Sequence, residues 1–393
     1  MKALPVKKNF FTLGVFILIV LAVNGLAFLA IRFYSGLGAV TNLDNQTPWG
    51  LWIGVDVAAG VALAAGGFTS AALAHVLHRD SYHAIVRPAL LTAMLGYTFV
   101  AFAVCIDIGR FYYIWHPLIM WNGNSALFEV GICVMIYMTV LYIEFLPIVT
   151  ERFIGKVNLP GALAAFNKPA ETVLKVLDKG LAKTMFVFII AGVVLSTLHQ
   201  SSLGTLMVIA GQKMHPLWQT PVLPLLFLLS AIAVGFPMII FESLIASRSF
   251  KLKPEMKILS NLGSMTLPLL GIYLAFKLGD MFIRETFFYV SRFDYTAWMF
   301  IAETGLLLIA FLMLLSKKTS QTPGSLFTAA SLVIAGVLLN RFNNFITAYR
   351  PFYDTVTYYP SIGEISVTIG CIALLVLIYR FVVIYFPVIS HEK

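Results

Sequence analysis

The sequence has little charge and little cysteine for its length. Of its 393 residues, 11% are charged and three are cysteines, whereas 60% are hydrophobic. Soluble globular domains carry about 25% charged residues, so this composition excludes an ordinary soluble protein. The mean hydropathy of +0.89 points the same way. The sequence therefore predicts an integral membrane protein.

The cysteines and histidines are too scattered to hold a redox centre. Cys105, Cys133 and Cys371 are isolated from one another, which supports neither a disulfide framework nor a cysteine-ligated iron–sulfur cluster. Haem held by two histidines needs imidazoles that face each other at membrane depth. The seven histidines instead fall near the two predicted membrane surfaces. We expect no haem, no iron–sulfur cluster and no other metal site in this chain.

Long apolar runs divide the chain into ten predicted membrane helices. About 20 apolar residues are needed to cross roughly 30 Å of hydrocarbon. The predicted spans are 10–34, 49–75, 85–108, 125–149, 184–206, 221–247, 256–281, 295–316, 326–346 and 362–387. The expected fold is an all-α integral membrane bundle with both termini on one side.

Basic residues indicate which side that is. With the N-terminus in the cytoplasm, 19 of the 27 lysines and arginines fall on the cytoplasmic side and eight do not. This asymmetry fits the positive-inside rule and predicts cytoplasmic termini. The net charge of +9 is then explained by topology and anionic membrane lipid rather than by nucleic acid.

One long polar connection interrupts the series of spans. Residues 151–183 contain NLPGALAAFNKPAETVLKVLDKGLAK, in which Pro169 can start a short amphipathic helix on the cytoplasmic surface. This connection divides the chain into four leading helices within 1–150 and six later helices within 184–393. We expect the first group to contribute part of a functional site.

The predicted loops on the opposite, periplasmic side are rich in aromatic and polar residues. The richest is 109–130, GRFYYIWHPLIMWNGNSALFEV, which includes Arg110, His116 and Glu129 beside two tryptophans. Indole and phenol rings prefer the polar interface of a bilayer. This face is therefore the expected docking surface for a periplasmic partner.

Carboxylates within apolar spans are the strongest functional signal, since each needs a partner, a proton or water. They are Asp56, Asp107, Glu129, Glu144, Glu242, Glu303 and Glu364. Glu129 and Glu144 lie fifteen residues apart on one predicted helix, about 22 Å in depth. With Tyr137 on the same face and Glu242 on a later span, they suggest a proton route. The alternative is that Glu144 and Glu242 extend to the cytoplasmic interface or pair with nearby arginines.

Asp56 lies in a run of small residues. The sequence GVDVAAGVALAAGGF places Gly54, Gly60, Ala64 and Gly67 at close to helical spacing, which lets neighbouring backbones approach. This helix should lie at the centre of a bundle and turn Asp56 towards a pocket. The alternative is an aspartate bound to a neighbouring backbone.

His199 and Gln200 begin the sequence HQSSLG at the periplasmic end of a predicted helix. Quinone reduction needs hydrogen-bond donors at the carbonyl groups, a proton relay and an apolar slot for the ring. An imidazole, an amide and two hydroxyls suit that chemistry. A structural histidine at the membrane interface is the alternative.

Together these stretches resemble the NrfD-like, or polysulfide reductase membrane-subunit, family, and more closely its HybB-type members from respiratory nickel–iron hydrogenases. The resemblance runs through most of the chain. It rests on PWGLWIGVDV, GVALAAGGF, IVRPALLTAMLGY, GRFYYIWHPLIMWN, LFEVGICVMIY, IEFLP, LHQSSLGTL, FESLIASRSF, NRFN and PSIGEISVTIG.

The resemblance implies a haem-free, quinone-reactive subunit of a hydrogen:quinone oxidoreductase in the bacterial inner membrane, inactive by itself. Electrons would come from the large and small [NiFe] hydrogenase subunits through a periplasmic ferredoxin-like subunit with four iron–sulfur clusters. They would reduce menaquinone or ubiquinone reversibly, with proton transfer across the membrane. A dimer of heterotetramers is the implied assembly.

The resemblance also implies roles for individual residues. Asp56, Glu129 and His199 would lie near the quinone head, with Gln200 beside them. The surroundings or the partner contact would come from Trp49, Arg110 and His116. Protons would pass along Glu129, Tyr137, Glu144 and Glu242.

Two other functions remain open at this point. One keeps the quinone chemistry but serves another periplasmic oxidoreductase, such as a polysulfide-type reductase. The other is a proton-coupled secondary transporter in which Asp56, Glu129 and Glu303 bind a substrate or ion. A transporter of that kind should show broken helices and inverted repeats.

Overall fold

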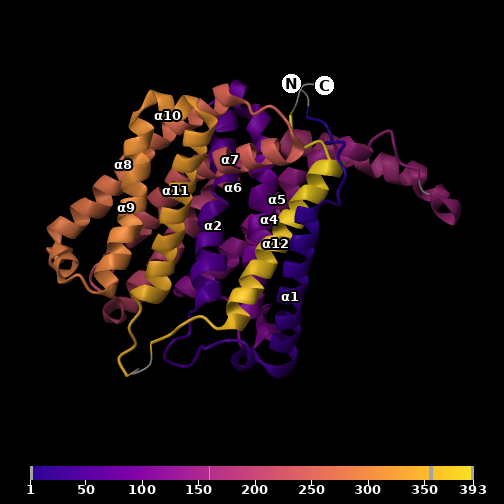
Figure 1. Ribbon diagram of the computed structural model, residues 1–393. Coiled ribbons are helices and arrows are strands. Elements are labelled where there is room, and N and C mark those ends of the chain that lie inside the picture. Colours follow the sequence, from indigo (N-terminus) through magenta and orange to yellow (C-terminus); the bar gives the residue numbers. More distant parts are fainter. Residues whose placement is uncertain (1–2, 159, 354–356, 391–393) are drawn as a thin grey trace.

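The computed structural model describes residues 3–158, 160–353 and 357–390, which form a bundle of helices (Figure 1). Within this described part, ten helices are long and apolar enough to cross a membrane, which confirms the predicted number. An isolated bridge joins Ala3 to Ser390, so the two chain ends lie together. Lys2 and Lys393, counted above among the cytoplasmic basic residues, lie outside the described residues.

Two names describe the ends of this bundle. The terminal end carries Ala3 and Ser390, and the distal end carries the connections 109–125, 211–222 and 284–294.

The spans are α1 (Leu13–Ser35), a broken second span, α4 (His83–Asp107), α5 (Ala126–Phe153), α6 (Asn167–Ala210), α7 (Leu223–Phe250), α8 (Met256–Ile283), α9 (Tyr295–Leu315), α11 (Pro323–Phe342) and α12 (Ile362–Tyr385). The short α10 (Lys317–Gln321) joins α9 to α11.

The helices pack as two bundles and a pair. The broken second span, α4, α5 and α6 form the first bundle, and α7, α8, α9 and α11 form the second. Helix α7 contacts both bundles. The first and last helices, α1 and α12, pack against each other at the side of the molecule away from α8 and α9 (Figure 1). Helices that are far apart in the chain, such as α1 and α12, are therefore neighbours in space. The division of the sequence into two groups of helices at 151–183 stays a prediction.

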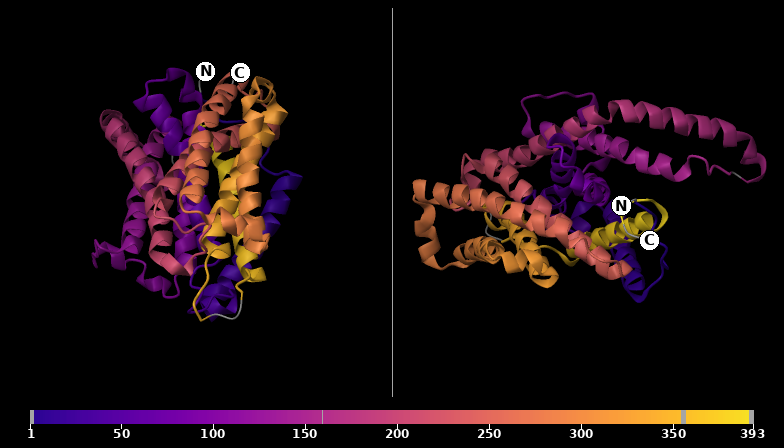
Figure 2. Two further views of the ribbon diagram at one scale, coloured as in Figure 1. Left: turned by 90° about the vertical axis from the view of Figure 1, so that its left-hand side faces the viewer. Right: turned by 90° about the horizontal axis from the view of Figure 1, so that it is seen from above.

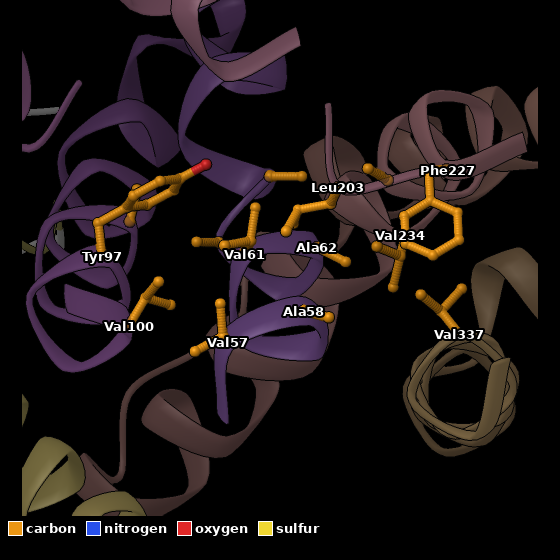
Figure 3. Packing of buried hydrophobic residues seen from close by; sticks show 14 of the residues in the cluster. Val57, Ala58, Val61, Ala62, Tyr97, Val100, Leu203, Phe227, Val234 and Val337 are labelled. Carbon is orange, nitrogen blue, oxygen red and sulfur yellow. The ribbon is translucent and has the colours of Figure 1, made fainter. Parts of the chain in front are cut away.

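The second span is the centre of the molecule, as its small residues predict. It consists of the π-helical η2 (Trp52–Ala59), α2 (Gly60–Leu63), α3 (Gly66–Ala71) and the π-helical η3 (Ala72–Val76). Its most apolar window is 83% buried, against 22% for α1. Figure 3 shows its valines and alanines between Tyr97 on one side and Phe227 on the other.

The structure has one continuous helix where the sequence predicts a separate surface helix before the fifth span. The helix expected to begin at Pro169 begins at Asn167 and runs without a break into the predicted span, giving a single helix α6 of 44 residues. At about 1.5 Å per residue, it is roughly twice as long as the hydrocarbon layer is thick. Its first turns reach beyond the rest of the bundle beside the end of α5 (Figure 2).

The distal connection 211–222 joins the two bundles and is fixed by backbone bonds. The His215 N–H donates to the Ala348 carbonyl at 2.8 Å, and Met214 forms a bridge with Tyr349. The Nδ1 atom of the buried His215 ring accepts from the Leu217 N–H at 3.3 Å, which requires an unprotonated nitrogen. Burial lowers the pKa of His215 to about 4, and the Arg350 guanidinium adds to this effect.

The α1–α12 pair gives a direct test of the packing. A Cβ atom on Gly370 would lie 2.7 Å from the Cα of Gly25. Gly370→Ala should force these helices apart and lower the free energy of unfolding by about 1–3 kcal/mol. Thermal unfolding of the detergent-purified protein measures this. The matched control is Gly131→Ala on α5, which has no neighbouring atom within 4 Å and should leave the midpoint nearly unchanged. Equal midpoints for the two variants would contradict the close crossing.

Acid should weaken the connection between the bundles through His215. Its unfolded-state pKa is near 6.5, above the folded value of about 4. The stability contributed by the neutral ring is therefore fully present above pH 6.5 and is lost as the pH falls towards 4. Melting curves between pH 4 and 8 should show this loss in the native protein. His215→Asn keeps an acceptor oxygen that does not titrate, so an unreduced acid dependence in this variant would argue against the assignment.

Candidate functional site

Three buried rings from three helices form the centre of the candidate site. Tyr97 of α4, Tyr137 of α5 and His199 of α6 are each at most 1% exposed. The Tyr97 hydroxyl lies 3.2 Å from His199 Nδ1, and the Tyr97 and Tyr137 rings meet edge to face with centroids 4.4 Å apart. Among the described residues, His199 Nε2 has no hydrogen-bond partner. The imidazole is thus held on one side and open to a further partner on the other.

Glu129 approaches this cluster through a serine on the same helix as His199. The Ser202 hydroxyl donates to Glu129 Oε1 at 2.5 Å, and Ser202 follows His199 by three residues on α6. Glu129 lies in the first turn of α5, where a helix N-terminus favours negative charge. Its side chain is exposed at the distal end rather than enclosed within an apolar span, which corrects the picture drawn from the sequence.

Gln200 ties α6 to the broken second span. Its Nε2 donates to the Val61 carbonyl at 2.8 Å, and its buried Oε1 has no partner among the described residues. Val61 lies just beyond the π-helical turns of η2, where the regular backbone pattern is interrupted. The hydrogen bond from Nε2 therefore holds the Gln200 amide group in place. Its Oε1 atom is left as a free acceptor, one residue along the chain from His199.

Asp56 lies in a different neighbourhood from His199. It accepts a hydrogen bond of 2.6 Å from Thr368 of α12, on the side of the first bundle that faces the α1–α12 pair. Its partner is therefore a side-chain hydroxyl rather than a backbone group. Trp49, which precedes η2, packs against Phe345 and Tyr349 at the distal end.

Arg110 and His116 lie in the distal connection between α4 and α5. Arg110 is exposed, and the His116 ring contacts the rings of Tyr113 and Trp115 with centroids 4.4 Å away in both cases. Within the described part of the chain, neither residue forms a hydrogen bond or a ring contact with Tyr97, Tyr137 or His199. Their position suits a surface that meets another protein or the membrane interface.

A large cavity opens at the terminal end. It has a volume of about 1030 Å³ and its ionisable lining includes His75, His83, Arg87, Glu144, Glu151 and Glu255. Glu144 lies seven residues after Tyr137 on α5, about two helical turns towards the terminal end. Its carboxylate packs against α6 at Gly192, where a Cβ would lie 2.7 Å from Glu144 Oε1.

Glu242 of α7 lies beside a smaller space at the same end. It accepts a hydrogen bond of 2.6 Å from Thr92 of α4, and it lines a cavity of about 60 Å³ together with Tyr379. Glu255 lines both terminal cavities, and burial raises its pKa. The structure thus brings Glu242 close to α4, and among the described residues no hydrogen bond joins it to Glu144.

Several site residues carry little signal in the sequence. Tyr97 is one tyrosine at the end of an aliphatic run, and Ser202 is one hydroxyl among several in α6. Their importance depends on which helices are neighbours, which hydropathy does not reveal. The unusual signal in both cases is a polar group on a helix face that is otherwise apolar.

Among the described residues, no group of three or more histidine, cysteine, aspartate or glutamate side chains is arranged to hold a metal ion. His75 and His83 do meet, with ring centroids 4.8 Å apart at an angle of 74°. Both lie on the terminal cavity rather than at membrane depth. A haem between two axial imidazoles does not fit this edge-to-face contact, because the rings leave no room for the macrocycle.

Comparisons with known proteins give the family. The model of polysulphide reductase, NrfD, matches residues 39–351. The chain is 32% identical over 367 residues to the probable Ni/Fe-hydrogenase 2 b-type cytochrome subunit of Escherichia coli K12, covering 92% of this chain and 88% of that protein. It is 28% identical to the integral membrane subunit of menaquinone reductase from Nitratidesulfovibrio vulgaris, covering 91% of this chain and 87% of the relative.

A further relative is a selenate reductase subunit of Mesobacillus selenatarsenatis, which is 26% identical over 98% of this chain and 96% of its own length. The first two relatives are membrane subunits of oxidoreductase complexes. The match to the family model and to the Escherichia coli protein confirms the resemblance found in the sequence motifs. The chain belongs to the polysulphide reductase NrfD family.

Proposed function

We propose that this chain is the quinone-reactive membrane subunit of a periplasm-facing [NiFe] hydrogenase complex. Its partners would be the large and small hydrogenase subunits and a ferredoxin-like subunit with four iron–sulfur clusters, and the chain alone would be inactive. The carrying observation is the buried His199, held by Tyr97 through Nδ1 and without a protein partner at Nε2, three residues from the serine that binds Glu129.

These residues fit the needs of a quinone head group. The quinone supplies the redox chemistry, since its reduction takes up two electrons and two protons. His199 Nε2 is positioned to hydrogen-bond a quinone carbonyl, and Glu129 with Ser202 would hold a proton nearby. Tyr97 and Tyr137 exclude bulk water from the inner side of the imidazole. Menaquinone is the substrate favoured by the menaquinone reductase relative.

Protons for this reaction would enter from the terminal cavity. Glu144 would take a proton there and pass it through water towards Tyr137, whose ring packs against Tyr97, the hydroxyl partner of His199. Glu242 with Thr92 would form a side branch fed by the smaller cavity. The cavity residues can hold several protons close to the entrance, because they combine carboxylates with imidazoles.

The remaining predicted residues would act around this centre. Asp56 would shape the quinone slot from the broken second span and Gln200 from α6, and Trp49 would border the slot at the distal surface. Arg110 and His116 would contact the iron–sulfur subunit. We also propose that the assembly is a dimer of heterotetramers and that neither haem nor an iron–sulfur cluster resides in this chain.

The orientation follows from charge. We propose that the terminal end faces the cytoplasm of a bacterial inner membrane and that the distal end faces the periplasm, since 19 of 27 basic residues fall on the cytoplasmic side in that orientation. Hydrogen oxidation outside and proton uptake from inside would then separate charge without a conformational pump. A membrane potential would drive the reverse reaction.

A polysulfide-type or other periplasmic reductase remains the second candidate partner, since the relatives include a selenate reductase subunit. The transporter alternative is weaker. Its three acids bind separate partners, namely Ser202 for Glu129, Thr368 for Asp56 and Lys277 for Glu303. A shared binding site would need them together.

The quinone site is tested by hydrogen-dependent reduction of a menaquinone analogue by the purified complex. Glu129→Gln and His199→Ala should each lower the rate by about 100-fold or more, as expected when a proton-transfer group is lost. Hydrogen oxidation with an artificial dye should stay at the native rate, which also reports assembly. The matched control is Glu285→Gln, an exposed carboxylate at the distal end. Native quinone rates in both site variants would refute these roles.

The proton route is tested on Glu144 in proteoliposomes. Glu144→Gln should slow quinone reduction and the build-up of membrane potential together, because the internal proton donor is lost. Gly192→Ala keeps the carboxylate but displaces it, so it should cause a milder defect of the same kind. Glu151→Gln, at the same cavity but paired with Arg87, serves as the control. A larger effect from Glu151→Gln than from Glu144→Gln would contradict this route.

A further inference from the structure

The first turns of α6 leave the bundle as an arm at the terminal end. We call residues 167–183 the arm, and they belong to the helix of 44 residues that continues as the fifth span. Figure 1 shows the arm extending sideways near the level where α12 ends, and Figure 2 shows it beyond the rest of the bundle. The arm packs along the end of α5. Its other sides are therefore available to a partner outside this chain.

The side of the arm that packs on α5 holds both of its acidic side chains. The Gly155 N–H donates to the two carboxylate oxygens of Glu171 at 3.0 and 3.1 Å, and the Thr150 hydroxyl donates to Asp178 at 3.1 Å. Glu171 and Asp178 are seven residues apart, which is about two turns, so they share one side of the helix. The negative charge of the arm is therefore directed towards α5.

Four lysines form a stripe on another side of the arm. Lys168, Lys175, Lys179 and Lys183 are separated by seven, four and four residues, which keeps them on one side of a helix, and all four are exposed. Lys175 pairs with Glu171 at 3.1 Å. Among the described residues, the side chains of the other three form no ion pair or hydrogen bond. This lysine stripe therefore presents positive charge that the chain itself does not balance.

A third side of the arm is apolar and exposed. Val173, Val176 and Leu177 have helical spacing and are 57%, 65% and 41% exposed. This apolar stripe continues into the membrane span of the same helix, because Val187 follows Val173 by fourteen residues, or nearly four turns, and Val194 follows Val187 by seven. Val187 and Val194 are 64% and 49% exposed. The side of α6 that faces lipid in the span is thus the side that is apolar in the arm.

The arrangement of the two stripes fits the surface of a bilayer. At about 100° per residue, the lysine stripe lies roughly 120° around the helix axis from the apolar stripe. A helix with such faces lies in the membrane interface with its apolar side in the acyl region. Lysine side chains then extend their ammonium groups to the level of the headgroups. Phosphate groups of anionic lipids carry the charge that complements them.

A second copy of this chain fits the arm less well. Its arm would bring another lysine stripe, and its two acidic side chains would be held by its own α5 in the same way. Like charges would therefore meet without compensation. A water-soluble partner would leave the continuity between the apolar stripe and the lipid-facing side of the span unexplained.

We propose that the arm is a binding site for anionic phospholipids of the leaflet at the terminal end. Their phosphate groups bind the lysine stripe, and their acyl chains cover the apolar stripe. The inference goes beyond the proposed function, because it does not depend on quinone chemistry or on the redox partner.

The test reads lipid selectivity at the arm itself. A fluorophore is attached to Val176→Cys in the full chain, with the three native cysteines replaced by alanine, in vesicles of equal parts phosphatidylcholine and phosphatidylglycerol. Brominated acyl chains, which quench the fluorophore on contact, are placed on one lipid or on the other. Brominated phosphatidylglycerol should quench more strongly than brominated phosphatidylcholine. Raising the salt concentration should reduce this preference, because exposed charges are screened.

Removing part of the lysine stripe should remove the preference. In Lys179→Gln/Lys183→Gln, the relative affinity for phosphatidylglycerol should fall about fivefold for each lysine, as expected for single lysines at an anionic membrane surface. The matched control is Lys317→Gln/Lys318→Gln, which removes two exposed lysines of α10 at the same end of the molecule. This variant should keep the native preference.

Three results would overturn the proposal. Equal quenching by both lipids in the chain with native lysines would show contact with the bilayer without recognition of anionic headgroups. Absence of quenching by either lipid would place the apolar stripe in water or against a protein, such as a second copy. A preference that survives Lys179→Gln/Lys183→Gln, or falls equally in the control, would show that the lysine stripe is not the binding site.

Discussion

The need to match every buried charge within the bundle constrains the rest of this structure. Hydrocarbon offers an ionised group no partner, so each charge must find one between helices or reach water. The chain meets this need in two places: the terminal cavity around Glu144 and the buried ion pair of Lys277 with Glu303. Both lie between packed helices, and the lipid-facing surfaces of α1 and α12 carry exposed apolar side chains instead.

Small residues let the helices that carry these polar groups pack closely against one another. Gly67 meets Ala93 of α4, where a Cβ on the glycine would lie 2.4 Å from that of the alanine. On the other side, Gly66 packs against the Gly235 carbonyl of α7. The second span therefore packs between α4 and α7 with little space on either side. This close packing lets Gln200 of α6 reach the backbone carbonyl of Val61.

Features that depend on the order of residues along the chain can be predicted from this sequence. Features that depend on which helices pack against each other cannot. Ten spans follow from apolar length, and the central second span follows from its glycines and alanines. The antiparallel packing of α1 on α12 joins the two ends of the chain and leaves no periodic signal. Charge counting placed Lys277 and Arg341 among the basic residues of the far side. They are in fact buried within α8 and α11. Lys277 is paired with Glu303 of a third helix. Arg341 donates to Asn340, to Ser230 and to the Phe227 carbonyl.

The His199 cluster (Tyr97, Tyr137 and His199) is connected to the buried Lys277–Glu303 pair by one stretch of chain. Helix α6 carries His199 and Ser202 and ends at Ala210, after which the connection 211–222 places Trp218 on Glu303. Backbone bonds to Ala348 and from Arg350 fix this connection on both sides. A shift of α6 at the proposed quinone site would therefore move Trp218, a donor to Glu303. Since that carboxylate also binds the Lys277 ammonium group, the geometry of this ion pair in the second bundle would depend on events in the first.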